Sequence, residues 1–241
     1  MRRHVEESRG QPGHAEEEQS DASQRDNNAS GDGKPARHHL EHTPRLVSCN
    51  LPIAIFGGTF DPIHSAHLTV AQEAADAFAL QRVLFVPAGR PPHKSESTGA
   101  SWLDRFRMVE LACAEAADPR FQPSRLEEGD QKSYSILTIE KVLAARSDRL
   151  YLILGADAFA EIGSWYRWRD VVAATEFVVV TRPGHSWTAP EGARVNRLDT
   201  LALPVSSSEI RRRLALGEMP DDLPHAVGQY IAEHRLYDWP G

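Results

Sequence analysis

The sequence predicts an α/β protein whose sheet is parallel and covered by helices on both faces. Short apolar runs rich in β-branched residues recur along the chain and alternate with segments of helical periodicity. Such alternation produces βαβ crossovers, which join parallel strands and place helices on both faces of the sheet. We therefore expect one domain over residues 48–241, a doubly wound, Rossmann-like sheet followed by a helical C-terminal segment.

The expected elements follow one another in a regular order. The four runs expected as strands cover residues 53–56, 82–86, 150–154 and 177–181. The segments expected as helices cover residues 65–79, 101–117, 134–146 and 156–174, with 207–216 and 224–236 in the C-terminal segment. Gly217 is expected to cap the first of these two, because glycine readily adopts the left-handed conformation, and Pro220 and Pro224 are expected to separate them.

Residues 1–47 are expected to form a disordered polar tail. From Met1 to His39 the chain contains no Leu, Ile, Phe, Tyr or Trp. Such a segment cannot bury enough apolar surface to offset its chain entropy. It also lacks the apolar core of a signal peptide, and the acidic run at 16–18 is unlike a transit peptide.

The composition of the whole chain argues against several classes of protein. The 241 residues carry a formal charge of −7, which gives no sign of a nucleic-acid-binding surface, and no stretch approaches the length of a membrane span. Two cysteines, Cys49 and Cys113, offer neither a disulfide framework nor a metal-ligand spacing, which favours a reducing cytoplasm. The sequence leaves open whether the chain forms a homo-oligomer.

The segment GGTFDPIHSAHL at 57–68 carries the strongest chemical signal. It stands where the first expected strand passes into the first expected helix. A helix N-terminus presents unpaired N–H groups and a partial positive charge, and Gly57 and Gly58 allow a polyphosphate to approach the backbone closely. His64 and His67, spaced i,i+3, can face it from one side of the helix. The segment therefore predicts a phosphate site beyond the carboxyl ends of the strands.

Other interpretations of the histidine pair are weaker. The His-x-x-His spacing is compatible with zinc, but no third ligand is nearby. Both histidines could also be polar residues that cap a helix. The length and chemical bias of the whole segment favour the phosphate site. Neither GxxxxGK[ST] nor GxGxxG is present, so the P-loop and dehydrogenase interpretations lose their main support.

The same segment resembles the signature of the HxGH nucleotidyltransferases. Later segments narrow the resemblance to the nicotinate-nucleotide adenylyltransferases and extend it from about Pro52 to Tyr237. These segments are VPAGRPPHK at 86–94, SYSILTI at 133–139, LGADAF at 154–159, Trp165 with Trp168, TRPG at 181–184 and VSSSEIRRRL at 205–214. Two residues depart from the family pattern: Ala66 replaces the motif Gly, and Ser208 stands where Thr is common.

The start of the first C-terminal helix has two compatible interpretations. Ser206 and Glu209 fit a capping box. The same helix start carries Ser207, Ser208 and Arg211, whose hydroxyls and guanidinium suit phosphate oxygens. The resemblance assigns this segment to the β- and γ-phosphates of ATP.

Two further motifs follow expected strands. Lys94 is either a plain surface charge or, at this edge of the sheet, a phosphate partner. Asp157 is expected to N-cap a helix. The resemblance instead places Gly155 and Asp157 around the adenosine of ATP.

An aromatic pair is the candidate for the second substrate. Trp165 and Tyr166 are more often core aromatics than ligand contacts. A flat nicotinate ring needs a stacking surface, however, and the resemblance assigns these two residues, together with Ser135, to nicotinate mononucleotide.

The resemblance implies transfer of AMP from ATP to nicotinate mononucleotide, giving deamido-NAD and pyrophosphate. It implies a set of catalytic residues: His64, His67, Lys94 and Arg211. It implies a set of ATP contacts: Gly57, Gly58, Thr59, Phe60, Gly155, Asp157, Ser207 and Ser208. Mg²⁺ is expected to bridge phosphate oxygens, without a protein metal site. The alternatives are transfer to nicotinamide mononucleotide or phosphopantetheine, and a non-catalytic nucleotide-binding module.

Overall fold

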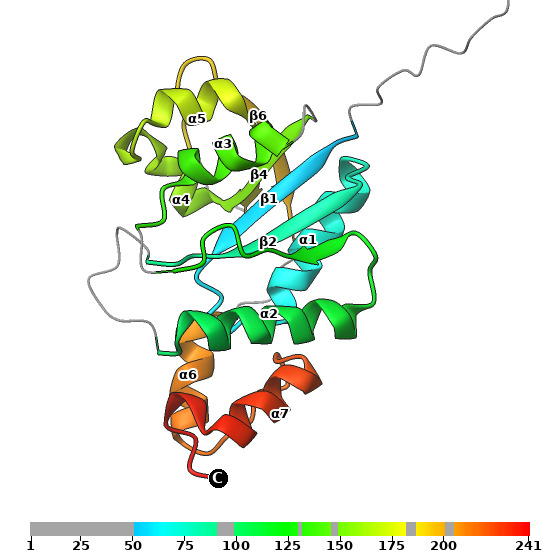
Figure 1. The fold of residues 1–241 in the computed structure, drawn as a ribbon, viewed down its shortest axis with the longest axis vertical. Helices are drawn as coiled ribbons and strands as arrows, with labels where there is room; N and C mark the ends of the chain where they lie inside the picture. The colour runs from blue at the N-terminus through cyan, green and yellow to red at the C-terminus, as the bar shows by residue number, and fades with distance from the viewer. Residues whose placement is uncertain (1–50, 91–98, 130–131, 146–148, 182–186, 201–204) are drawn as a thin grey trace, which may run out of the picture. The chain divides into compact units, whose positions relative to one another are not determined.

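A six-stranded parallel sheet forms the centre of the fold (Figure 1). The computed structural model describes residues 51–90, 99–129, 132–145, 149–181, 187–200 and 205–241, all within the compact unit Val47–Gly241. Lys94 and all of the expected tail, residues 1–47, lie outside these ranges. The strands are β1 (Ile53–Gly58), β2 (Arg82–Pro87), β3 (Phe121–Pro123), β4 (Leu150–Gly155), β5 (Glu176–Thr181) and β6 (Arg194–Asp199).

The strand order confirms the doubly wound fold. Across the sheet the order is β3-β2-β1-β4-β5-β6, and every neighbouring pair is parallel. The first strand is central, with Ile53 opposite Arg82 of β2 on one side and Leu150 of β4 on the other. The chain therefore winds outward in two directions from β1. The gap between the carboxyl ends of β1 and β4 is the switch point at which such folds bind ligands.

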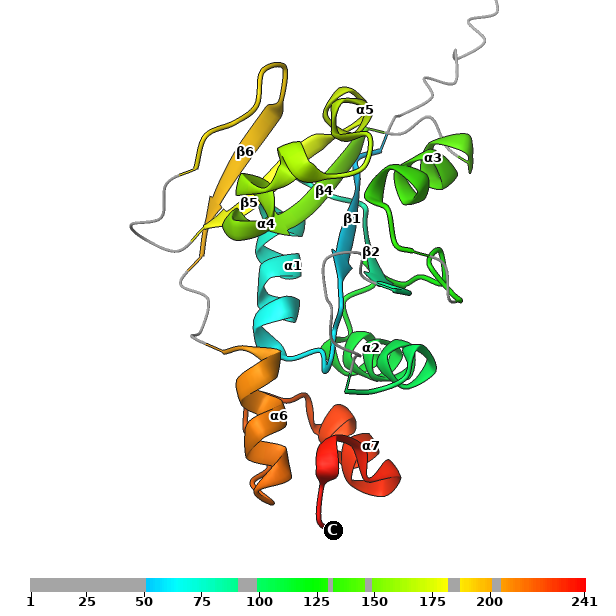
Figure 2. The same ribbon diagram turned by 90° about the vertical axis from the view of Figure 1, so that its left-hand side faces the viewer.

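Helices cover both faces of the sheet. They are α1 (Ser65–Ala77), α2 (Trp102–Ala116), α3 (Ser135–Ala145), α4 (Ala156–Ala160), α5 (Trp168–Ala174), α6 (Ser207–Ala215) and α7 (His225–His234), with 3-10 turns η1 (Ile162–Ser164) and η2 (Leu236–Asp238). Figure 2 shows α1 and α3 on opposite sides of the sheet. No helix within the described ranges has the length and apolarity of a bilayer span.

Alternation along β1 divides the interior into two clusters, because successive side chains of a strand point to opposite faces. Ala54 and Phe56 belong to a cluster with residues of α1, α2, α6 and α7. Ile53 and Ile55 belong to a second cluster with residues of α3, α4 and α5. Both faces of the sheet are therefore buried, as the apolar runs predicted.

The expected helix 156–174 is wrong, because the structure breaks it into α4, η1 and α5. Trp165 has an extended backbone (φ −72°, ψ 146°) and Arg167 is left-handed (φ 52°), so the helix cannot continue through them. Two strands were not predicted: β3, which has only 3 residues, and β6, an edge strand whose charged residues interrupt the apolar pattern.

The caps of α6 agree with expectation only in part. Gly217 has φ +78°, and its N–H donates to the carbonyl of Leu214 at 2.9 Å, which confirms it as the capping glycine. Ser206 Oγ accepts from the N–H of Glu209 at 3.2 Å. The Glu209 carboxylate pairs with Arg212 at 2.6 Å, so this side chain does not complete the predicted capping box.

Candidate functional site

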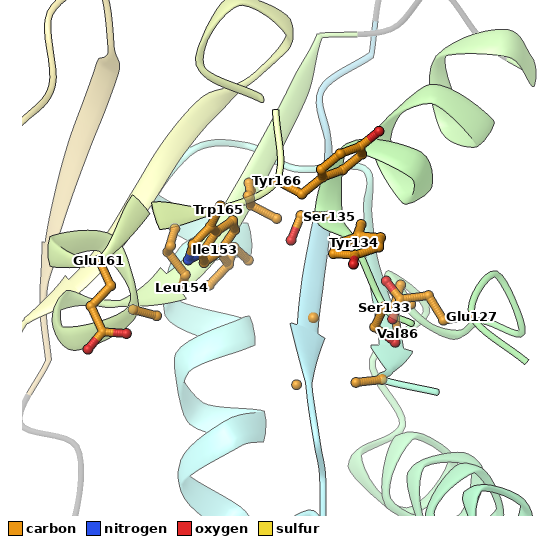
Figure 3. A pocket seen from close by; sticks show the side chains of 15 residues that line it. Val86, Glu127, Ser133, Tyr134, Ser135, Ile153, Leu154, Glu161, Trp165 and Tyr166 are labelled. Carbon is orange, nitrogen blue, oxygen red and sulfur yellow. The ribbon is translucent and has the colours of Figure 1, made fainter. Parts of the chain in front are cut away.

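A pocket of about 290 Å³ opens at the switch point between β1 and β4 (Figure 3). It brings together five of the predicted site residues: Gly57, Gly58, Ser135, Trp165 and Tyr166. Its other walls come from strand ends and from the segments before α3 and after β4: Val86, Ala88, Glu127, Ser133, Tyr134, Leu152, Ile153, Leu154, Ala158 and Glu161. The pocket combines apolar strand ends with aromatic rings, which suits a flat heterocycle.

Aromatic side chains on two separate segments border this pocket. The rings of Tyr134 and Tyr166 lie 4.7 Å apart between centroids, and 53% of Tyr166 is exposed. Trp165 is half-buried and packs against the apolar cluster of the α3 face. The Ser133 hydroxyl is buried and has no hydrogen-bond partner among the residues that the structure describes. A polar group of a ligand in this pocket could therefore meet an unused donor beside the start of α3.

The histidine pair lies at the start of α1, with ring centroids 3.8 Å apart. His64 is the N-cap residue, and its backbone N–H donates to Nδ1 of His67 at 3.2 Å. Because Nδ1 of His67 accepts this hydrogen bond, the neutral ring carries its proton on Nε2. Nδ1 of His64 is buried without a partner.

Burial keeps both imidazoles neutral at pH 7. Desolvation lowers the pKa of His64 to about 4. Desolvation, followed by the proximity of His64, lowers the pKa of His67 well below its usual value. A bound polyphosphate would favour the charged form of each ring, so the pair can strengthen its interaction as negative charge develops beside it.

The N–H groups at the start of α1 are largely engaged within the protein. The N–H of Ser65 donates to the carbonyl of Asp222 at 2.8 Å, and that of His67 to the carbonyl of His64 at 2.9 Å. The expectation that unpaired N–H groups of this helix receive a phosphate is therefore wrong for these two groups and for His64. Side chains have to supply most of the donors at this end of the site.

The ring of Phe60 packs against the histidine pair. Its side chain is 2% exposed, and its ring meets that of His67 edge-on at 5.1 Å between centroids. A Cβ on Gly58 would come within 3.0 Å of this ring, so the absence of a side chain there has a packing reason. Because the Phe60 ring is in the core, only its backbone is available to a nucleotide.

The start of α6 is joined to the same β1–α1 loop. Ser207 Oγ donates to the carbonyl of Pro62 at 3.0 Å. Arg211 donates through Nη1 to the carbonyl of Asp61 at 2.6 Å and through Nη2 to Ser208 Oγ at 3.4 Å. The structure thus brings the predicted phosphate residues of α6 to the loop that leads into the histidine pair.

Comparisons with known proteins agree on one family. A family model described as cytidylyltransferase-like matches residues 55–213. A protein of Solibacter usitatus (strain Ellin6076), described as a probable nicotinate-nucleotide adenylyltransferase, is 57% identical over 190 residues, which cover 78% of this chain and 100% of that protein. The chain belongs to the nicotinate-nucleotide adenylyltransferase family.

Other members of this family and its solved structures are also similar. An Acidothermus cellulolyticus protein with the same description is 40% identical over 196 residues, covering 77% of this chain and 93% of that protein. The Plasmodium falciparum nicotinic acid mononucleotide adenylyltransferase complexed with NaAD has a TM-score of 0.64 at 20% identity, over 78% of this chain and 98% of that one. At this identity the likeness supports the shared fold.

Two residues of this adenylyltransferase-family chain that are predicted to bind ATP, Gly155 and Asp157, belong neither to the aromatic pocket nor to the histidine pair with α6. Gly155, rather than Asp157, is the N-cap of α4, so the predicted cap is wrong because the helix begins two residues earlier than a cap at Asp157 requires. Asp157 is exposed in the first turn of α4, and neither residue lines the pocket. They lie at the carboxyl end of β4, and their role in adenosine binding stays a prediction.

Arg105, which was not predicted, joins two loops next to the site. It is 1% exposed and donates to the carbonyls of Thr59 at 2.6 Å and Ala88 at 2.8 Å. Burial lowers its pKa, and the nearby Asp61 charge partly offsets this effect. A signal was present in the sequence, because Arg105 occupies the apolar stripe of α2 with Val109 and Ala112.

The described part of the chain offers no group of three His, Cys, Asp or Glu side chains that could hold a metal ion. Asp61, next to the histidine pair in sequence, accepts hydrogen bonds through both carboxylate oxygens.

Proposed function

We propose that this chain is a nicotinate-nucleotide adenylyltransferase, which transfers AMP from ATP to nicotinate mononucleotide and yields deamido-NAD and pyrophosphate. The observation that carries the proposal is the β1–α1 loop, because it serves both parts of the site. Gly57 and Gly58 line the aromatic pocket. A few residues later the same loop leads to His64 and His67 and bonds to Arg211.

The reaction requires positioning and charge stabilisation more than covalent catalysis. A 5′-phosphate oxygen of nicotinate mononucleotide forms a bond to the α-phosphorus of ATP, while the bond from that phosphorus to the bridging oxygen breaks. Pyrophosphate leaves with the electron pair. A phosphate monoester is already ionised at neutral pH, so no strong general base is required.

The residues divide these tasks between them. Nε2 of His67 is a fixed donor, and His64 lies beside it in a partly dry environment, where donors to developing charge are most effective. Arg211 would offset charge on the leaving pyrophosphate, with Ser207 and Ser208 nearby. Lys94, outside the described residues, keeps its proposed role as a further cation.

Mg²⁺ enters this proposal as part of the ATP complex. Bound to phosphate oxygens, it would neutralise charge on the pyrophosphate as it leaves. A protein carboxylate is not needed for this role, which fits the engaged oxygens of Asp61. The cytoplasm stays the expected compartment on cysteine usage alone, with Cys113 a buried free thiol, and self-association is left open.

Acceptor specificity tests the function directly. The pure protein is incubated with ATP, Mg²⁺ and nicotinate mononucleotide, nicotinamide mononucleotide or phosphopantetheine, while pyrophosphate is measured. We expect kcat/KM to be far higher for the nicotinate acceptor, because groups that pair with a carboxylate are left unpaired by an amide. Equal values for acid and amide would contradict the specificity. Turnover of phosphopantetheine alone would select that alternative, and no turnover would favour a binding module.

A further inference from the structure

Three residues from distant parts of the chain meet around the buried carboxylate of a fourth. We call this group the C-terminal clamp: Asp61, Gly99, Arg211 and Tyr237. Asp61 comes from the β1–α1 loop, Gly99 precedes α2, Arg211 lies on α6 and Tyr237 lies in η2. Tyr237 is beyond residue 213, where the family model ends.

The carboxylate of Asp61 is fully engaged. Its Oδ2 accepts from the N–H of Gly99 at 2.8 Å, and its Oδ1 from the N–H of Ala100 at 3.1 Å and from the hydroxyl of Tyr237 at 2.9 Å. Arg211 Nη1 lies 3.7 Å from Oδ2. A carboxylate that is 4% exposed requires such partners, because a buried charge that loses a donor is destabilised.

Unusual backbone geometry places the tyrosine hydroxyl on this carboxylate. Arg235, Tyr237 and Asp238 all have left-handed φ values, of 49°, 59° and 57°. Non-glycine residues seldom adopt this region, because their Cβ crowds the backbone there. Burial and the charge of Asp61 raise the pKa of Tyr237, so its hydroxyl remains a donor across the working pH range. This turn therefore holds the Tyr237 hydroxyl in a lasting hydrogen bond to the Asp61 carboxylate.

Packing couples Tyr237 to Arg211. A Cβ built on Gly99 would lie 2.9 Å from Cδ1 of Tyr237 and 3.0 Å from Cδ of Arg211. Both side chains therefore press against the same glycine. Arg211 also donates to the backbone carbonyl of Asp61. The position of its guanidinium therefore depends on the position of Asp61, to which Tyr237 is hydrogen-bonded.

We propose that Tyr237 is a positioning residue that acts through Asp61 to hold Arg211 at the phosphate end of the site. The inference rests on the proposed function of Arg211 in binding the β- and γ-phosphates. Its consequence is that Tyr237 contributes to ATP affinity without contacting ATP.

The test compares two conservative tyrosine substitutions. Tyr237→Phe removes the hydroxyl from Asp61. Tyr230→Phe is the matched control, because its hydroxyl also donates to an aspartate, Asp104 of α2, at 3.0 Å, away from the β1–α1 loop that Tyr237 contacts. We expect Tyr237→Phe to raise the KM for ATP about fivefold to tenfold with kcat within about twofold, and Tyr230→Phe to leave both unchanged. An unchanged KM in Tyr237→Phe would overturn the proposal.

A double-mutant cycle shows whether the effect passes through Arg211. In an Arg211→Ala background, Tyr237→Phe should change the KM for ATP by less than about twofold, because the residue it positions is gone. The full effect in that background would overturn the proposal. Gly99→Ala, which crowds both side chains, is a second variant and should raise the KM in the same direction.

Pyrophosphate binding separates this proposal from the proposed function. Isothermal titration calorimetry with inorganic pyrophosphate and Mg²⁺ measures the affinity of the phosphate end of the site without turnover. Weaker binding to Tyr237→Phe than to Tyr230→Phe supports the clamp even if the acceptor assay fails. Equal binding by the two variants overturns it even if the wild-type chain is an active adenylyltransferase.

Discussion

The aromatic pocket and the histidine pair differ in how their side chains are held. Tyr166 at the pocket is 53% exposed, whereas His64 is 5% exposed and both histidine rings pack among other rings. Ligand contacts in the pocket can therefore change with little effect on the fold. The histidines are part of the fold, so their chemistry and the stability of the chain are linked. This difference predicts which substitutions change substrate affinity, which change turnover and which change stability.

The largest expected effect is on turnover at the histidine pair. His64→Ala or His67→Ala should lower kcat by about a hundredfold or more, as for loss of a donor to developing charge. Steady-state kinetics at saturating substrates measures the loss, and circular dichroism verifies folding. A variant that keeps most of its kcat would contradict the donor role, as would loss of activity to a zinc-specific chelator in excess Mg²⁺.

The second effect is a loss of stability in mild acid. The pKa of His64 is lowered from 6.5 to about 4 on folding, so between these values the unfolded chain binds the proton that the folded chain excludes. The free energy of unfolding should therefore fall as the pH falls from 6.5 towards 4. His64 alone contributes about 2 kcal/mol of this loss between pH 7 and pH 5, and His67, whose pKa is also lowered, adds to it. Urea unfolding at both pH values measures it. His64→Asn should reduce the difference, and an equal loss in that variant would contradict the assignment.

The third effect separates the pocket from the histidines. Trp165→Ala should raise the KM for nicotinate mononucleotide about tenfold, because a stacking surface is lost, while the KM for ATP stays the same. Trp168→Ala is the matched control, since Trp168 stacks on Arg169 at 4.5 Å and does not line the pocket. Similar effects of both substitutions on the acceptor would show that Trp165 acts through packing alone.

A smaller effect is expected at Ala66, which replaces the motif glycine beside the histidines. It is 8% exposed in the first turn of α1. Ala66→Gly should lower stability by about 1 kcal/mol, because glycine is the poorer helix former, and should change the KM for ATP by less than about tenfold. A rise in kcat/KM by orders of magnitude would instead identify Ala66 as an impairing residue.

The smallest effect is expected from the polar tail. Deleting residues 1–47 should leave the melting temperature and both KM values nearly unchanged, because their composition cannot form a core. Calorimetry and the acceptor assay measure this on the shortened chain. A clear loss of activity would give the tail a functional role.

Local signals explain what could be predicted from the sequence. The buried strands, the histidine pair and the cap at Gly217 depend on neighbouring residues, so the pattern alone located them. The break at Trp165 and Arg167 was missed because no Pro marks it and only the folded backbone shows it. The partners of Asp61 were missed because Tyr237 lies 176 positions further along the chain. No periodic pattern records a contact over that distance.

That separation also affects when the protein becomes competent during its synthesis. Strand β1 and the histidines are made well before Tyr237, which follows Asp61 by 176 positions. Contacts between distant residues also form late in folding, since closing a long loop costs entropy first. A nascent chain can therefore hold a nearly complete sheet while Arg211 still lacks its final position. On this proposal, tight binding of ATP would begin only after the segment that carries Tyr237 has been made and has folded onto Asp61.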